Sequence, residues 1–572
     1  MSGRNEKRNT ETGEMTAAEY IRELAVSAYM LALFVVLPLI LKDKYRMLGT
    51  FKYEVFRLIS LIGLGMVILT EVSVLLTSWY RNRGKSRPNT SSGRQRVSEL
   101  WKGLSLTDRF VLGYGICVII SFCLSVDKMQ AIWGTKGWYM GLVSQLIFVL
   151  SYFVVSRWWS GSRTVWYLAC GTAFIVYLLG VLHRFSVDPL GLYEELSEGT
   201  IKQYLSLIGQ NTWYSSYMCT LFPLGLFLFW GIGAGKHLDT GDKKRRTGHR
   251  KKAAFYSSEE LLIRLAGGIF CAVGFASWVT QNSDSAYIAL SLIVLVLFYY
   301  GFTGNEWMER FLEVLLLLFF SAAVTGFLQD LFPEQAVLPE TISIFLTKSL
   351  FPVLGFLAVC VVYVLFFYGE RRGLRIERYV WIGRAAVLLY VLAVLMLAGV
   401  VVLNTKGYLA DWFGFSTQNN YLLFDQNWGN GRGRTWSFSA QVLREFPWYR
   451  KLFGAGPDSF AAYGYGNPVY AQQLADMWGD STLTNAHCEW MNELVCYGIV
   501  GAACFAGIFV SAVGRFCKAG RSNPALIAVA LCLLSYTGHN VFCYQQAVCT
   551  PFVFLILGMG ERLLTLEETG CS

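Results

Sequence analysis

Two arginines in the later part of the chain stand where an anion could be bound. Residues 430–434 read Asn-Gly-Arg-Gly-Arg, a turn-like run that leads into an amphipathic stretch, residues 435–446, which stops before Pro447. If a helix begins here, Arg432 and Arg434 lie beside the free backbone amides of its first turn, an arrangement that suits a diphosphate. Arginines at a turn are also often merely solvated, so both interpretations stay open.

A histidine and two carboxylates follow at the head of another apolar stretch. His487 comes first, and Glu489 and Glu493 lie on one face of the helix that we expect there. An ionisable residue within a membrane span costs roughly 2.5 to 3.5 kcal/mol on insertion scales, so such residues usually face a cavity or a partner. Histidine titrates near neutrality, which suits a general base or a group that orients an acceptor hydroxyl. A plain interfacial histidine fits the same position, and His183 and His539 are alternatives for the role of base.

The elements that must hold these residues are membrane spans. The chain has 572 residues, 54% of them hydrophobic and only 15% charged, which does not describe a water-soluble protein of this length. The apolar residues fall in blocks of about 17 to 25, the length that crosses a bilayer, as at residues 24–41, 56–79 and 379–403. We count about fourteen such blocks. The sequence therefore predicts an all-α, polytopic transmembrane helical bundle.

Lysines and arginines in two connecting loops predict how the spans are oriented. Residues 80–109 and 234–260 are strongly basic, and basic loops remain on the cytoplasmic side of a membrane. An even number of spans then places both termini in the cytoplasm. The basic runs alternate with spans and have no interleaved aromatic residues, so we predict that the protein does not bind nucleic acid.

One long segment near the end divides the chain into three parts. We expect spans 1–11 within residues 1–402 and spans 12–14 within residues 487–572. Residues 403–486 form a large extracytoplasmic loop, far longer than an ordinary connection. The loop is rich in aromatic residues, which disordered segments lack, so we expect it to be ordered and to carry short helices. Trp436 within it is a candidate platform for a sugar or a lipid, with core packing as the alternative.

The order of short motifs on either side of this loop resembles that of the O-antigen ligase family. Members share Gly-Arg, a nearby Trp, then Pro and Gly-x-Gly-Pro, followed by a His at the head of a span with two glycines behind it. The first block matches at Gly433, Arg434, Trp436, Pro447, Gly454, Gly456 and Pro457. The second block matches at His487, Gly498 and Gly501. The resemblance covers residues 408–508, and elsewhere it consists of the multi-span architecture.

Two positions depart from the family pattern. Many members carry Ser-Arg-Gly at an external turn between mid-chain spans, with the arginine at the donor phosphate, whereas Ser283, Asp284 and Ser285 stand here. Cys488 follows His487 where asparagine is usual. We retain Asp284 as a candidate donor-contacting residue because of its place at this turn. The departures leave the choice between a ligase and a polymerase open.

The resemblance implies a membrane glycosyltransferase of the bacterial cytoplasmic membrane. Such an enzyme moves a glycan from an undecaprenyl-diphosphate-linked donor to an acceptor hydroxyl of a glycan or lipid on the outer face. Arg434, helped by Arg432, would clamp the diphosphate, and His487 would serve the acceptor hydroxyl. Glu489 and Glu493 would orient His487 or line the same polar site. Because the leaving group is already a diphosphate, we expect neither a metal nor a cofactor.

A transporter is the alternative from another functional class. A chain with this many spans also suits a lipid-linked oligosaccharide flippase or another polysaccharide transporter. Many transporters are built from internal repeats, whereas the sequence has no evident repeat between its halves and has one long loop placed late. We therefore prefer the transferase.

Overall fold

The protein is almost wholly helical over the residues that the computed structural model describes, 17–81, 101–233, 257–339 and 342–568. Two short strands, β1 (Tyr204–Leu205) and β2 (Gly209–Gln210), pair antiparallel in the connection before α10. The predicted all-α fold class is confirmed. Most of the two basic loops, residues 82–100 and 234–256, lies outside the described residues.

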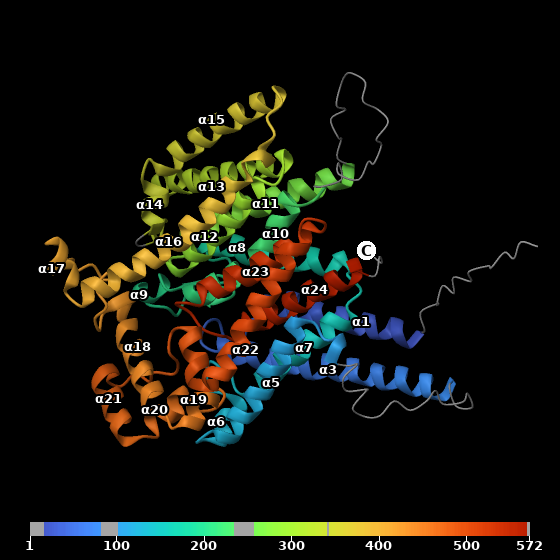
Figure 1. Cartoon of the computed structure of the whole chain (residues 1–572), viewed down its shortest axis with the longest axis vertical. Helices are drawn as coiled ribbons and strands as arrows, with labels where there is room; N and C mark the ends of the chain where they lie inside the picture. Colours follow the sequence, from blue (N-terminus) through green and yellow to red (C-terminus); the bar gives the residue numbers. More distant parts are fainter. Residues whose placement is uncertain (1–16, 82–100, 234–256, 340–341, 569–572) are drawn as a thin grey trace, which may run out of the picture.

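Long helices make up the bulk of the molecule (Figure 1). Those before the long segment are α1 (Ala17–Leu31), α3 (Leu48–Arg81), α5 (Leu106–Leu124), α7 (Leu142–Trp158), α8 (Arg163–His183), α10 (Asn211–Trp230), α11 (Ser258–Thr280), α12 (Ser285–Gly301), α13 (Asn305–Leu331), α15 (Phe351–Arg371) and α16 (Val380–Thr405). Those after it are α22 (Glu489–Ala519), α23 (Pro524–His539) and α24 (Thr550–Glu568). Shorter pieces are η1 (Ala32–Val36), α2 (Leu37–Leu39), α6 (Lys128–Trp133), α9 (Glu198–Ile201), α14 (Ile342–Lys348) and η2 (Ile376–Tyr379).

Many of these helices have the length and composition of membrane spans. Within the described ranges, nine helices are long and apolar enough to cross a membrane, and α7, α12 and α23 are shorter apolar helices. None of the most apolar window of α16 is buried inside the protein, which is what a helix facing lipid shows. The multi-pass membrane architecture is confirmed, while the number of about fourteen spans stays a prediction.

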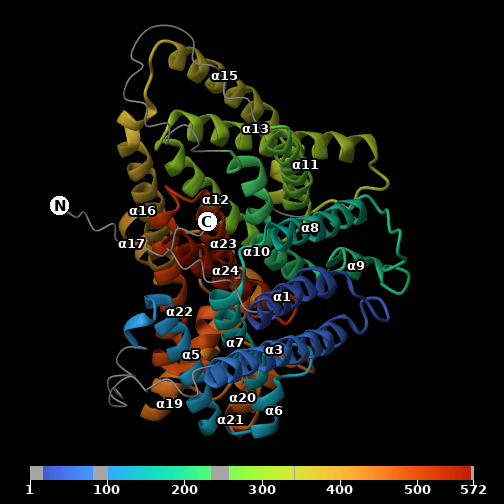
Figure 2. The same ribbon diagram turned by 90° about the vertical axis from the view of Figure 1, so that its right-hand side faces the viewer.

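The segment between α16 and α22 is a compact group of short helices. It holds α17 (Tyr408–Phe413), α18 (Trp428–Glu445), α19 (Trp448–Phe453), α20 (Phe460–Tyr465) and α21 (Pro468–Trp478). In Figures 1 and 2, α19, α20 and α21 lie together with α6 at one end of the molecule, and α13 and α15 lie at the other. The segment therefore packs against the spans, and it contacts α5 and α22 in particular.

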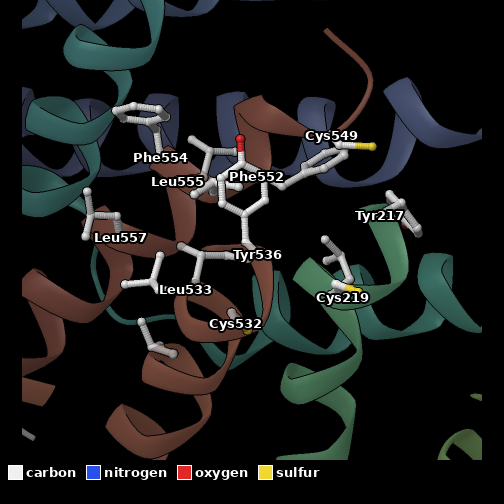
Figure 3. Close-up of a cluster of buried hydrophobic side chains, with 14 of the residues drawn as sticks. Tyr217, Cys219, Cys532, Leu533, Tyr536, Cys549, Phe552, Phe554, Leu555 and Leu557 are labelled. Carbon is white, nitrogen blue, oxygen red and sulfur yellow. The ribbon is translucent and has the colours of Figure 1, made fainter. Parts of the chain in front are cut away.

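The last two helices form the centre of the hydrophobic core. Figure 3 shows Tyr217 and Cys219 of α10 facing Tyr536 of α23 and Phe552 of α24, all of them nearly fully buried. Eleven of the 16 residues of α23 are buried and none is exposed, as is typical of a helix that is apolar all round and lies inside a bundle. The core thus holds the connection between α23 and α24, which borders the candidate site, in a fixed position.

The span α22 is interrupted at Gly498, whose backbone angles are φ 68° and ψ −172°. This break removes the normal partners of nearby helix carbonyls. The freed carbonyls of Val495 and Cys496 instead accept hydrogen bonds from the backbone N–H groups of Ala455, at 2.9 Å, and Gly456, at 3.0 Å. The Gly-x-Gly-Pro motif therefore docks directly on the broken helix.

Close contact at this junction explains why its glycines have no side chain. A Cβ atom on Gly498 would lie 2.4 Å from the backbone carbonyl of Leu452, and one on Gly454 would lie 2.2 Å from the carbonyl oxygen of Cys496. Both glycines also have positive φ angles. The two motif blocks that the sequence separates thus meet in space, and their contact positions the first turns of α22.

Candidate active site

His487 immediately precedes α22 and has a left-handed backbone conformation, with φ 49°. Its backbone N–H donates to Asn485 Oδ1 at 2.9 Å, and its half-buried ring meets the ring of Tyr544 edge to face, with centroids 5.3 Å apart. Burial lowers the pKa of His487 to about 4, and the positive charge of Arg432 lowers it further in the same direction. The imidazole is therefore neutral near pH 7 and is able to accept a proton.

Arg432 is the arginine on the His487 side of α18. Residues 429–431 have left-handed angles, and the regular helix begins only after them. The guanidinium of Arg432 donates to the carbonyl of Gly429 at 2.8 Å and to that of Phe542 at 3.1 Å, and it lies 5.7 Å from the Phe542 ring centroid. The start of α18 is thereby tied to the connection between α23 and α24. A fixed cation stands close enough to His487 to shift its pKa.

Arg434 contacts a different part of the protein from Arg432, namely the end of α21 and the residues before α18. Its guanidinium donates to the carbonyl of Met477 at 3.1 Å and to Asn427 Oδ1 at 3.4 Å, and it lies 5.9 Å from the Trp478 ring. Positions two apart on a helix point roughly 200° away from each other. The two arginines that the sequence assigns to one clamp therefore occupy two faces of the same helix, and Arg434 borders a cavity of 510 Å³.

Trp436 belongs to an aromatic cluster on the next turn of α18. Its ring stacks on Phe542, with centroids 5.8 Å apart and planes at 10°, and it lies 4.9 Å from Trp428. Trp428 in turn donates from its indole N–H to the carbonyl of Tyr421 at 3.0 Å. The half-buried Trp436 ring thus packs against protein on the side of Phe542.

Glu489 and Glu493 are buried in a polar network beneath the start of α22. Glu489 Oε2 accepts from the backbone N–H of Gln545 at 2.6 Å, and Glu493 Oε1 accepts from Tyr114 Oη at 3.1 Å. The Gln545 side chain links further to Gln145, which donates to it at 2.6 Å. The partners of the two carboxylates come from α5 and the α23–α24 connection, and Gln145 of α7 bonds to both of these partners. The network therefore holds these elements and the first half of α22 together.

Asp284 at the turn between α11 and α12 meets the long segment. Its Oδ2 accepts a hydrogen bond from Tyr421 Oη at 2.8 Å. Burial and then the bond to Asp284 raise the pKa of Tyr421 to about 12, so the phenol keeps its proton. Asp284 thus anchors the stretch of chain that leads to Arg432.

The two alternative histidines are fully buried. His183 Nδ1 accepts from the backbone N–H of Ser206 at 2.9 Å, and His539 Nε2 lies 3.3 Å from the carbonyl of Thr212. Both rings therefore serve to connect backbone segments. His487 has the more accessible imidazole among these three.

The sequence analysis did not identify several residues that lie at the site. Tyr114 and Gln145 are polar residues in apolar helices, a signal that was available, and Gln545 lies in a polar run between two spans. Phe542 gave no signal, because it is one of many phenylalanines in the chain. Asp458 was also missed; its Oδ2 accepts from the backbone N–H groups that precede α7, and burial raises its pKa to about 7.

The described residues contain no group of three or more His, Cys, Asp or Glu side chains that could hold a metal ion. In comparisons with known proteins, the sequence model of the O-antigen ligase family matches residues 335–506. No curated protein matches the chain. The match includes Arg432, Arg434 and His487, and it confirms the resemblance over the segment in which the site is built.

Proposed function

Because residues 335–506 carry an O-antigen ligase domain, we propose that the protein transfers a glycan from an undecaprenyl-diphosphate-linked donor to an acceptor hydroxyl. The site would lie at the outer face of the bacterial cytoplasmic membrane. In this reaction the bond between the anomeric carbon and the diphosphate oxygen breaks, and a bond from that carbon to the acceptor oxygen forms. The observation that carries the proposal is that the connection between α23 and α24 brings the candidate base and a cation together. Tyr544 of this connection meets the ring of His487, and the carbonyl of Phe542 accepts a hydrogen bond from Arg432.

Arg432 is the first candidate for the departing diphosphate. Two of its donors hold the carbonyls of Gly429 and Phe542, and a guanidinium has five N–H groups, so others remain for phosphate oxygens. The backbone amides at the start of the regular helix add partial positive charge. Arg434 adds positive charge at the same helix start, although its side chain points roughly 200° away from that of Arg432. Negative charge that develops on the leaving group is thus met by groups already in place.

His487 is the candidate base. A neutral imidazole accepts the proton of the acceptor hydroxyl as the new bond forms. Glu489 and Glu493 act as positioning residues, since they fix the first turns of α22 through Gln545 and Tyr114. Asp284 has a comparable role toward the segment before α18 through Tyr421.

The arrangement of the helices supports the proposed orientation. In Figure 1, the first residues of α1 and the last turn of α24 lie toward the right, whereas α17 lies at the left edge. The two ends of the described chain are therefore on the side away from α17. Cytoplasmic termini and an external long segment fit this arrangement together with the basic loops.

The sidedness of the accumulated donor tests the proposal against a transporter. His487→Ala should lower the transfer rate by about a hundredfold to ten-thousandfold, the usual contribution of a general base. Lipid-linked donor should then accumulate in the outer leaflet of spheroplasts, where an added lectin or glycosidase reaches it. Donor confined to the inner leaflet would instead identify a flippase, and full activity of the variant would remove His487 from the mechanism.

A further inference from the structure

A cavity of 510 Å³ opens beside Arg434, on the face of α18 away from Arg432. Its wall is formed by side chains that precede α18, namely Gln418, Asn420, Asp425 and Asn427, and by Trp478 at the end of α21. The volume lies within the roughly 300 to 1,000 Å³ that is usual for sites of small ligands. The cavity is thus large enough for a ligand group and is separate from the surroundings of His487.

The wall carries the groups that recognise hydroxyls rather than an anion. Side-chain amides such as those of Gln418 and Asn427 both donate and accept hydrogen bonds, as a hydroxyl does, whereas a phosphate only accepts them. The carboxylate of Asp425 accepts hydrogen bonds and repels an anion. The Nε atom of Arg434 and the indole nitrogen of Trp478 are buried and have no protein partner. Neither of these two atoms has accessible surface, so the donors that remain for a ligand are the further terminal N–H groups of the Arg434 guanidinium.

Trp478 adds an apolar surface to these polar groups. The indole ring offers a flat face that packs against the C–H face of a sugar ring. Side-chain amides, one carboxylate, one guanidinium and one indole together match an uncharged ring that bears several hydroxyl groups.

We propose that this cavity binds one uncharged sugar unit of the glycan substrate, through its hydroxyl or acetamido groups. The inference rests on the proposed function and deepens it. Arg432 and His487 act where the bond is broken and formed, whereas the cavity holds a sugar of the glycan on the other face of the helix start. Arg434 then serves sugar recognition in addition to its position near the diphosphate.

Saturation-transfer difference NMR on the full-length protein in lipid nanodiscs tests this inference. Glucose, galactose, mannose and N-acetylglucosamine are the probes, each added separately. Gln418→Trp places a bulky ring at the wall of the cavity and leaves the hydrogen bonds of Arg434 in place. Gln472→Trp, at an exposed position of α21 outside the wall, is the matched control. We expect at least one sugar to give a signal with the wild type and the control, and that signal to disappear in Gln418→Trp.

The other outcomes overturn the inference. An equal signal in Gln418→Trp would show that the sugar binds elsewhere, and silence from all probes with the wild type would show that no sugar site exists. Displacement of the sugar by inorganic pyrophosphate would identify an anion site. His487→Ala keeps the two proposals apart, because it should lower the transfer rate strongly and leave the sugar signal unchanged. Full transfer in His487→Ala together with signal loss in Gln418→Trp would refute the mechanism and leave the cavity assignment standing.

Discussion

Replacing Gly498 by alanine should destabilise the protein although the change adds only one methyl group. Gly498 interrupts α22 at φ 68° and ψ −172°, a region that is essentially restricted to glycine. The residues of α22 before it include Glu489 and Glu493, and His487 directly precedes the helix. The substitution therefore acts on the junction that positions the candidate base.

The size of the effect follows from two contributions. A residue other than glycine in this backbone region costs about 1 to 3 kcal/mol. The new Cβ would also lie 2.4 Å from the carbonyl carbon and oxygen of Leu452 and 2.5 Å from the backbone nitrogen of Phe453. These are backbone atoms that no rotamer change removes, and overpacking of this kind costs about 1 to 3 kcal/mol. Together the loss is about 2 to 6 kcal/mol.

Gly514 on the same helix provides the matched control. A Cβ there meets nothing within 4 Å, and glycine in a helix interior is less favourable than alanine by about 0.5 to 1 kcal/mol. Gly514→Ala should therefore be neutral or slightly stabilising. The two variants make the same chemical change in one span, so their difference isolates the break in the helix.

The unfolding temperature of the purified protein in detergent, followed by tryptophan fluorescence, measures the effect. Transfer activity of the same samples shows whether the position of His487 has changed. We expect a clearly lower unfolding temperature and reduced transfer for Gly498→Ala only. Equal unfolding temperatures for Gly498→Ala and Gly514→Ala would refute the reasoning, because the strained backbone and the contact with Leu452 would then contribute nothing.

Three further predictions concern the chemistry of the site. Arg432→Lys keeps the charge but loses the planar fork of the guanidinium, so it should reduce the transfer rate more than Arg434→Lys does. Arg434→Lys should mainly raise the KM for the donor. A larger loss in Arg434→Lys than in Arg432→Lys would show that Arg434 makes the main contact with the diphosphate. The pKa of His487 is lowered to about 4, so the neutral imidazole persists as the pH falls and is lost only near that value. The value of kcat/KM should therefore stay flat from about pH 8 to pH 5. A pH profile of kcat/KM with its midpoint near 6.5 would contradict the buried environment of His487. If protein cations neutralise the diphosphate as proposed, transfer in liposomes should survive EDTA. Complete loss of transfer that magnesium restores would show that a metal takes part.

Hydropathy predicts most of the fold because spans that face lipid must be apolar along their length. It is less decisive for helices inside the bundle, since these can carry polar groups that have protein partners. Glu561 in α24 is one example: it is buried and pairs with Arg515. α10 and α24 are accordingly not among the nine apolar candidates. The exact number of spans therefore cannot be read from hydropathy.

The sequence suggests candidate residues for the site but not how they are placed relative to one another. The sequence marks Arg432 and Arg434 as a pair, yet which one faces His487 depends on where the regular helix starts. The start of the regular helix is set by residues 429–431, which have left-handed backbone angles. Among them Asn430 has φ 61°, and the local sequence does not fix such an angle. Long-range partners such as Phe542 escape sequence reasoning for a different reason, because the fold alone brings them to α18.

The connection between α23 and α24 has a consequence for protein engineering. The carbonyl of Phe542 accepts a hydrogen bond from the guanidinium of Arg432, and the ring of Tyr544 contacts the ring of His487. Gln545 donates hydrogen bonds to the carboxylates of Glu489 and Glu493. Phe542, Tyr544 and Gln545 lie beyond residue 506, where the family match ends. A chimera that exchanges only residues 335–506 between related proteins would combine Arg432, His487 and Glu489 of one protein with the α23–α24 connection of the other. An exchange that aims to transfer substrate specificity should therefore include residues 540–549 together with the long segment.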